Sequence, residues 1–187
     1  MLLEAPFTEE KIRALKVGEK VEITGLVFTG RDAVHKYLHD GGKPPVDLTD
    51  SIIYHCGPVV VKEKGRWVVK AAGPTTSIRE EPYQGPLMEQ YKIRGVIGKG
   101  GMGPKTLEYC RKVGAVYFHA IGGAAQVLAE RVVAVDGVHM MEEFGSPEAI
   151  WEFRVVRFPV VVTMDAHGQS LHAEVLAASQ DALDRLG

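Results

Sequence analysis

The sequence predicts a single α/β domain built on one mixed β-sheet. Its 187 residues, of which 45% are hydrophobic, suffice for one substantial core with at most a small appendage. Strand patterns dominate the first half of the chain, whereas helices and strands alternate in the second half. No internal repeat, low-complexity segment or shift in composition marks a linker. We therefore expect residues 1–187 to form one domain.

The first elements combine a short helix with a strand. Thr8 followed by two acidic residues is typical of a helix start, and this brief helix should end near Gly18. Apolar residues alternate with other residues over 21–27, which predicts a strand. A second short helix is expected at 32–39, before the glycine–proline loop at 41–45.

β-branched residues then predict a strand followed by a hairpin. The strand covers 52–56. The two arms of the hairpin are expected at 59–62 and 67–71, joined by the charged turn 63–66. The segment 73–77, which begins with glycine and proline, ends this strand-rich region.

The second half is expected to alternate between helix and strand. Pro104 suits the first turn of a helix, where its missing N–H is not needed, and Ser146, Pro147 and Glu148 together resemble a helix start. The expected elements are a helix at 86–94, a strand at 95–97, a helix at 104–113, a strand at 115–119, a helix from 122 to 129, a helix from 146 to 151, a strand at 153–163 broken by Pro159, a turn at 165–168, a strand at 171–175 and a helix at 179–186.

Charge and hydropathy exclude several classes of partner. The chain has 22 basic and 24 acidic residues without a long run of either sign, so no nucleic-acid footprint is visible. Its start lacks the basic and apolar regions of a signal peptide. No apolar run approaches the roughly 20 residues that a membrane helix needs. We expect a cytoplasmic protein that binds neither nucleic acid nor membranes.

The two cysteines, Cys56 and Cys110, lie far apart in the sequence. A cubane iron–sulfur cluster needs at least three cysteine ligands, and no histidine lies beside either thiol at zinc-ligand spacing. We therefore predict no metal site in this chain and two reduced, buried thiols, with Cys110 in the core on a helix.

Four glycine-flanked loops carry polar side chains that suit binding or catalysis. Two arginines and a lysine in such loops would form an anion pocket, because the arginine fork donates two parallel hydrogen bonds to a carboxylate. Loops also commonly carry such residues without any function. The polar residues are Arg31; then Thr75, Thr76, Ser77 and Arg79; then Lys99; and finally Asp165, His167 and Ser170.

The glycines at 98, 100 and 103 match a dinucleotide-binding pattern in spacing only. That fold expects an acidic residue roughly 20 positions further on, at the end of the next strand. The next predicted strand, 115–119, ends in histidine followed by Ala-Ile-Gly-Gly. No P-loop spacing occurs either, so we predict no nucleotide site.

Six short stretches, in order along the chain, resemble the beta subunit or C-terminal domain of class I iron–sulfur fumarases and L-tartrate dehydratases. Together they span most of the chain, which makes them far more specific than any single loop. The stretches are 31–36 (RDAVHK), 73–79 (GPTTSIR), 97–102 (IGKGGM), 120–125 (AIGGAA), 143–149 (EFGSPEA) and 162–168 (VTMDAHG).

The resemblance implies a swivelling β/β/α domain and a hydro-lyase that interconverts fumarate and (S)-malate. It also implies a partner alpha subunit that carries three cysteines and a [4Fe–4S] cluster, so this chain alone would be inactive and colourless. Two chains of each type would form the assembly. The Met1 start favours a separate subunit, although a fragment of a fused enzyme would look the same.

The resemblance also assigns roles to four residues. The first threonine after Gly-Pro, Thr75, maps to the catalytic base, and Arg79 maps to a ligand of the substrate carboxylate. Lys99 and Arg31 would lie in the substrate pocket, and Lys99 would also assist catalysis. The other interpretation of Thr75 is that it caps a turn and bonds to its own backbone.

The chemistry explains why such residues are needed. Removing a proton beside a carboxylate builds negative charge there, and one preorganised donor aimed at that charge is worth about 2.7–4 kcal/mol. A metal ion with an open position can act as Lewis acid on the leaving hydroxide. A threonine hydroxyl is a weak base, so nearby cations must favour its alkoxide. Lys99 and Arg79 are candidates if the fold brings them close.

Two alternatives stay open at this point. The substrate can be tartrate or a methylated dicarboxylate, because all of these molecules share the same carboxylates. The chain can also be a stand-alone, non-catalytic module that binds small carboxylates. Of the histidines, His35 is expected on an exposed helix face, and His167 is expected in a turn, bonded to Asp165.

Overall fold

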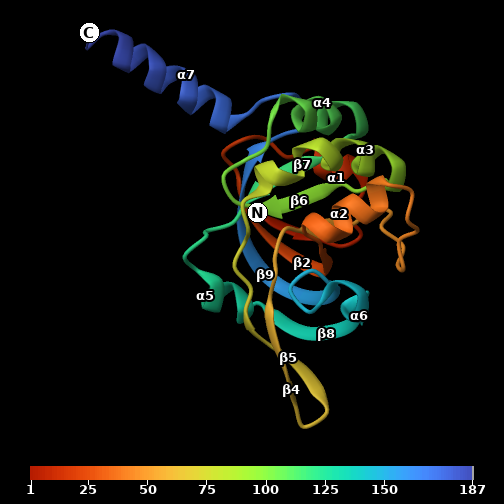
Figure 1. Cartoon of the computed structure of the whole chain (residues 1–187). Helices are drawn as coiled ribbons and strands as arrows, with labels where there is room; N and C mark the ends of the chain where they lie inside the picture. The colour runs from red at the N-terminus through yellow and green to blue at the C-terminus, as the bar shows by residue number, and fades with distance from the viewer. Residues whose placement is uncertain (187) are drawn as a thin grey trace.

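The computed structural model describes residues 1–186, whose centre is a seven-stranded mixed sheet (Figure 1). Its strand order is β1-β2-β3-β6-β7-β9-β8. Neighbours from β1 to β7 run parallel, whereas β9 runs antiparallel to β7, β8 and β2. The strands are β1 (Leu2–Glu4), β2 (Lys20–Thr29), β3 (Ile52–Tyr54), β6 (Gly95–Gly98), β7 (Val116–His119), β8 (Val132–His139) and β9 (Ile150–Met164).

The sheet closes into a small barrel because β9 pairs with both β7 and β2. The barrel strands are β2, β3, β6, β7 and β9, while β1 and β8 extend the sheet outside the ring. The predicted α/β class with a mixed sheet is confirmed. The swivelling β/β/α character stays a prediction.

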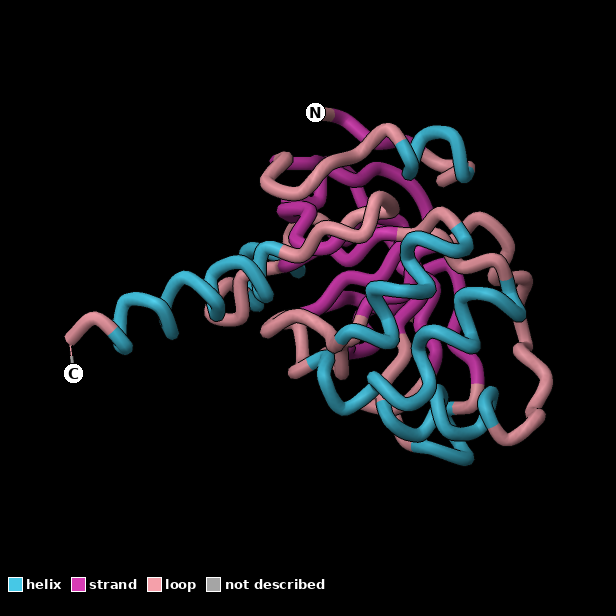
Figure 2. The backbone as a smooth tube through the Cα atoms, turned by 90° about the horizontal axis from the view of Figure 1, so that it is seen from above, coloured by secondary structure: helices cyan, strands magenta, loops and turns pink. Residues whose placement is uncertain are grey.

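The remaining elements surround this barrel. The hairpin of β4 and β5 projects from one end, and α7 extends away from the body (Figures 1 and 2). None of the helices within residues 1–186 has the length and apolar character needed to cross a membrane. These elements are β4 (Val59–Glu63), β5 (Arg66–Ala71), α1 (Glu9–Arg13), α2 (Asp32–His39), the 3-10 turn η1 (Ser77–Glu80), α3 (Glu81–Tyr91), α4 (Pro104–Val113), α5 (Ala125–Ala129), α6 (Met141–Phe144) and α7 (Leu171–Asp184).

Alternation along the strands divides the apolar residues into two cores. Ile52 and Tyr54 point into one core with Phe118, whereas Ile53 and Tyr117 belong to the other. Successive side chains of a strand point to opposite faces, so one core fills the barrel and the other lies beneath α2, α3 and α4 (Figure 1). Each fully buried large apolar side chain contributes roughly 1.5–3 kcal/mol to folding.

Several predicted elements have the expected bounds. The helices at 32–39 and 104–113 match α2 and α4, and the hairpin matches β4 and β5. The strand at 21–27 lies within β2. In each case, local signals such as alternation, first-turn proline and turn residues agree with the tertiary environment.

The helix predicted from residue 86 begins at Glu81 instead. Pro82 occupies the first turn, so Pro86 lies inside the helix. Proline has no N–H, which leaves the carbonyl oxygen of Pro82 without its usual helical partner. Lys105 Nζ of α4 donates to that oxygen at 2.9 Å. A tertiary contact therefore compensates for the interior proline.

The helix predicted at 146–151 is wrong, because residues 146–149 form a turn and bend and β9 starts at Ile150. Glu148 does lie at a helix start, but at that of α2, where its carboxylate accepts a hydrogen bond from Ala33 N at 3.0 Å. Thr29 Oγ1 donates to Ala149 O at 3.0 Å and accepts from Trp151 N at 2.9 Å. These bonds hold the segment against β2 as a strand.

The C-terminal part also differs from the prediction. The strand predicted at 171–175 is wrong, because Ser170 Oγ accepts from Ala173 N at 3.3 Å and caps α7. Strand β8 was not predicted. Pro159 does not break β9, because it faces Glu22 of β2 in a stretch that pairs with neither β7 nor β8.

Candidate active site

Three of the predicted loops meet at one end of the barrel. The parallel strands β2, β3 and β6 all end there, which brings Arg31, His55 and Lys99 to the same edge. The turn after β5 completes the edge, because Thr75 N donates to His55 O at 2.7 Å and Lys99 N donates to Thr75 O at 3.3 Å. The structure therefore brings Thr75, Arg79, Lys99 and Arg31 to one region.

Arg79 connects Thr75 to α2. Its Nε and Nη2 each donate to the carboxylate of Asp32 at 2.9 Å, and Nη2 also donates to Thr75 Oγ1 at 3.0 Å. The pairing lowers the pKa of Asp32 and raises that of Arg79. The Arg79 side chain is 42% exposed, so part of the guanidinium is accessible. The Thr75 hydroxyl thus lies beside a fixed positive charge.

Arg31 is held by a second carboxylate. Its Nε lies 3.2 Å from Glu148 Oε1, and both side chains are largely covered. A Cβ at Gly57 would lie 2.3 Å from Arg31 Nη1, so only glycine leaves room for the guanidinium in this position. Arg31 is therefore fixed in position next to Asp32 of α2.

Lys99 is the third cation of the region. It is half-buried and follows the end of β6. A Cβ at Gly122 would lie 3.1 Å from Lys99 Cδ, so this glycine accommodates the lysine side chain. Among the described residues, no carboxylate approaches Lys99 Nζ within the 4.0 Å of an ion pair. The region therefore combines three cations with the two carboxylates of Asp32 and Glu148, which favours an anionic ligand.

A buried polar network lies beneath this surface and was missed by the sequence analysis. The prediction of an exposed His35 is wrong, because its side chain is fully buried. Its neighbours Val34 and Leu38 are also buried, so the position of His35 within the apolar stripe of α2 was the available signal. The other fully buried members of this network are His55, Ser77, Glu80, Gln84 and Tyr117.

The fourth polar loop lies at the other end of the barrel. Strand β9 is antiparallel to β7, so the loop after Met164 leaves the end opposite to Lys99. Asp165 Oδ1 accepts from the backbone N–H groups of His167 and Gln169 at 3.0 Å each. The predicted turn around His167 is confirmed. The structure does not bring this loop together with the other three.

The two thiols are poor candidates for any chemistry. Cys56 and Cys110 are fully buried, and burial raises the pKa of each to about 12. Thiols with such pKa values remain protonated and unreactive, and Cys110 lies on α4 as predicted. Within residues 1–186, no group of three or more His, Cys, Asp or Glu side chains is arranged to hold a metal ion.

The N-terminus of α4 is occupied by a side chain. Glu81 accepts from Gly103 N at 2.8 Å and from Thr106 N at 3.1 Å. These amides are the groups that would bind a phosphate at a helix start. The carboxylate of Glu81 therefore occupies the amide groups that would have to bind the phosphates of a dinucleotide.

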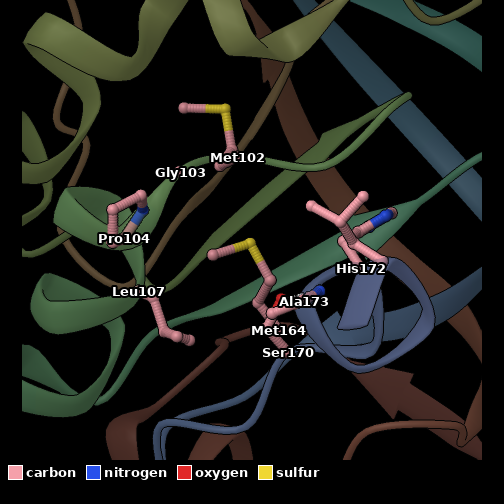
Figure 3. Close-up of a pocket in the computed structure, with 9 residues that line it drawn as sticks. Met102, Gly103, Pro104, Leu107, Met164, Ser170, His172 and Ala173 are labelled. Carbon is pink, nitrogen blue, oxygen red and sulfur yellow. Dashed lines mark hydrogen bonds between the residues drawn. The ribbon is translucent and has the colours of Figure 1, made fainter. Parts of the chain in front are cut away.

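An apolar pocket lies away from the four predicted residues. It lies between the start of α4 and the start of α7, and its wall includes Met164 and His172 (Figure 3). Ser170 of the fourth polar loop lies in its wall, but Arg31, Thr75, Arg79 and Lys99 do not. Of these four residues, Arg79 is exposed and the other three are half-buried.

Comparison with known proteins supports the resemblance noted above. The sequence model of the Fumarase C-terminus family matches residues 1–175. A Geobacillus stearothermophilus protein, provisionally named a class I fumarate hydratase, is 59% identical over 184 residues, or 98% of this chain. This chain spans only 35% of that relative's length.

Two further relatives are close to this chain in length. The beta subunit of L(+)-tartrate dehydratase from Escherichia coli is 38% identical over 175 residues, which cover 92% of this chain and 87% of the relative. A Methanocaldococcus jannaschii protein with the same name, given provisionally, is 39% identical over 184 residues, covering 96% of this chain and 94% of the relative.

Proposed function

Because this chain belongs to the Fumarase C-terminus family, we propose that it is the cluster-free part of a hydro-lyase that interconverts fumarate and (S)-malate. The observation that carries the proposal is the convergence of Thr75, Arg79, Lys99 and Arg31 at one barrel edge. A C4 dicarboxylate carries two negative charges, and this edge combines three cations with only two carboxylates.

We propose that the cations bind the substrate carboxylates. Arg79 already holds Asp32 with its fork, so a substrate carboxylate would bind its remaining exposed N–H groups. Lys99 would supply a second contact, because no carboxylate of residues 1–186 neutralises it. Arg31, which precedes Asp32 and pairs with Glu148, would contribute a third positive charge. Such preorganised donors stabilise charge as it develops on the carboxylate beside the broken C–H bond.

Thr75 is the proposed base. Threonine can take a proton from carbon only as its alkoxide, which becomes the hydroxyl, so the alkoxide must be stabilised. The Arg79 guanidinium donates to Thr75 Oγ1 at 3.0 Å, and a hydrogen bond from a cation favours the charged form of an acid. In malate dehydration, the substrate C–H proton would pass to Thr75 Oγ1, and in fumarate hydration the same proton would return to carbon.

The described residues of this chain do not fit an iron–sulfur cluster. Both thiols are fully buried with raised pKa values. We propose that the [4Fe–4S] cluster of the holoenzyme is held by a cluster-bearing alpha subunit, which covers the open barrel edge. The E. coli and M. jannaschii relatives are named beta subunits, which supports a separate partner chain. The assembly of two chains of each type stays a prediction.

L(+)-tartrate is the alternative substrate. It has the same two carboxylates, and two of the relatives described above carry the name of the tartrate enzyme. The higher identity to the Geobacillus relative, 59% against 38–39%, favours fumarate and malate. A non-catalytic carboxylate-binding module is the second alternative. The cytoplasmic location stays a prediction from the sequence.

The test is an anaerobic hydro-lyase assay of this chain mixed with its cluster-bearing partner. Malate, fumarate and L-tartrate are supplied separately, and each chain alone serves as a control. Turnover of malate and fumarate by the mixture only would support the proposal. Preference for tartrate would change the substrate and keep the mechanism. A formed complex with an intact cluster and no turnover would contradict the hydro-lyase and favour the binding module.

A further inference from the structure

A continuous hydrogen-bonded chain runs beneath the Thr75–Arg79 turn. Tyr117 Oη donates to Ser77 Oγ at 2.9 Å, and Ser77 Oγ lies 2.9 Å from His55 Nδ1. Gln84 Oε1 lies 2.8 Å from His55 Nε2 and 2.8 Å from the Nε2 of His35. These side chains come from β7, η1, the residue after β3, α3 and α2, so the chain connects five segments below the candidate site.

The backbone oxygen of Arg31 defines one hydrogen position in this chain. It can only accept, so His35 presents an N–H at Nδ1, 2.9 Å away. The Gln84 amide lies beside the Nε2 atoms of both histidines, and with its oxygen facing them its nitrogen has no partner in the part of the chain that the structure describes. With its nitrogen facing them instead, the amide donates to both Nε2 atoms, and both histidines are neutral.

Glu80 is the buried carboxyl group beside His35. Its Oε2 lies 3.6 Å from His35 Nδ1, its side chain is fully buried, and neither oxygen has a hydrogen-bond partner among the described residues. Burial, followed by the nearby Asp32 carboxylate, raises the pKa of Glu80 to about 8, and burial lowers that of His35. Two buried charges are thus disfavoured, and the pair is neutral, with Glu80 protonated.

The turn η1 depends on this pair for its position. Ser77 and Glu80 are buried, whereas the two residues between them, Ile78 and Arg79, are exposed. The turn is therefore anchored at Ser77 by the histidine chain and at Glu80 by the burial of its side chain. Asp32, which receives both hydrogen bonds of the Arg79 fork, is also the carboxylate beside Glu80.

We propose that the buried Glu80–His35 pair is a positioning element that holds the Arg79 guanidinium and the Thr75 hydroxyl in place. Its role in catalysis rests on the proposed function. Loss of the Glu80 proton would leave a net negative charge beside Asp32. The charged groups facing Glu80 are His35 and Asp32 on α2, Arg79 on its own turn and Glu148 before β9. The two carboxylates would repel it, and η1 would shift.

The first experiment uses NMR on the chain alone, so its result does not depend on hydro-lyase activity. The Arg79 Nε–H and Thr75 methyl resonances are followed through a pH titration, with assignments from Arg79→Lys and Thr75→Ser. Both resonances should shift together with a midpoint near the Glu80 pKa of about 8. Glu80→Gln, which mimics the protonated form, should abolish the shift. Glu81→Gln, the adjacent glutamate that caps α4, should retain it.

The second experiment measures the holoenzyme. In the wild type, kcat should fall on the alkaline side with the same midpoint, whereas Glu80→Gln should keep its activity there. Glu80→Ala should lower kcat on the order of tenfold to a hundredfold with a smaller change in KM, and Glu80→Gln should restore it. Resonances that do not move in the wild type, or an alkaline transition that persists in Glu80→Gln, would overturn the proposal. An inactive complex whose resonances still shift would refute only the proposed function.

Discussion

At the scale of single residues, Thr75 is distinguished by what surrounds its hydroxyl. The guanidinium of Arg79 donates to it, while its backbone is fixed by His55 and Lys99 on two neighbouring strand ends. Its neighbour Thr76 is exposed and lies on the same turn. The two threonines therefore offer a matched pair for separating chemistry from folding.

Thr75→Ala is expected to lower kcat of the holoenzyme by about 10²–10⁴-fold, the usual contribution of a general base. Only one hydrogen bond is lost, so the free energy of unfolding should change by roughly 0.5–1.5 kcal/mol. Steady-state kinetics and urea denaturation measure the two effects. Thr76→Ala is the control and should keep the normal rate. A near-normal rate in Thr75→Ala would remove Thr75 as the base.

Arg79→Lys keeps the positive charge but removes the fork that binds Asp32. A lysine makes a single point contact, so we expect KM for the dicarboxylate to rise and kcat to fall, each by about tenfold. Arg157→Lys, which alters an exposed ion pair with Glu22, is the control and should leave both constants unchanged. Wild-type kinetics in Arg79→Lys would argue against a carboxylate clamp.

At the scale of elements, the turn before β9 shows how a local signal can be correct and still assign the wrong element. Ser146, Pro147 and Glu148 have the chemistry of a helix start, and Glu148 does bind an N-terminal amide. That amide belongs to α2, more than a hundred residues earlier in the chain. The sequence contains the acceptor but not the identity of its donor, so only the folded chain distinguishes the two possibilities.

Thr29→Val tests how β9 is attached to β2. Thr29 is buried and its hydroxyl makes one hydrogen bond on each side of Ile150. Valine has nearly the same shape but leaves Ala149 O and Trp151 N unsatisfied, so we expect a loss of about 1–3 kcal/mol in the free energy of unfolding. Urea denaturation measures it. Thr76→Val, on the surface, should be neutral, and an unchanged midpoint in Thr29→Val would contradict this account.

The elements that were predicted correctly share a property. Helices α2 and α4 and the β4–β5 hairpin are specified by residues within their own segments. The strand β8 and the first turns of α7 were missed, because alternation and apolar runs over short windows do not separate strand from helix. The buried position of His35 was within reach, since it shares a helix face with Val34 and Leu38.

At the scale of the whole molecule, the barrel could not be read from the sequence, because its closure depends on pairing between β2 and β9. Residues as distant as Lys20 and Val161 are neighbours in that ladder. The convergence of Arg31, Thr75, Arg79 and Lys99 was implied by the family resemblance. Their shared position follows from parallel strands that end on one side, whereas the network under them joins five segments and has no local signature.

Glu80 should also affect the stability of the whole domain. Its pKa is raised from 4.5 to about 8 on folding, so its contribution is fully present below pH 4.5 and is lost as pH rises toward 8. The free energy of unfolding should therefore fall across this window, by at most about 1.36 kcal/mol per pH unit. The buried histidines make the free energy of unfolding rise with pH instead, since burial lowers the pKa of His55 to about 3.

Comparison with Glu80→Gln isolates this contribution. The variant lacks the titrating group, so its stability relative to the wild type should improve steadily with pH through the window. Thermal unfolding at a series of pH values measures the difference. Glu81→Gln is the control, and its stability should change with pH in the same way as that of the wild type. A constant difference between Glu80→Gln and the wild type would show that Glu80 ionises normally.

The closure of the barrel by β9 has a consequence for how the chain is made. Strand β2 is complete within the first 29 residues, but its antiparallel partner spans residues 150–164. During synthesis, the backbone groups on one side of β2 therefore stay unpaired until residues 150–164 have been made. An unpaired strand edge of this kind can pair with other nascent chains. Contacts of this sequence separation also fold slowly. The ribosome-bound chain should thus be the form most dependent on chaperones.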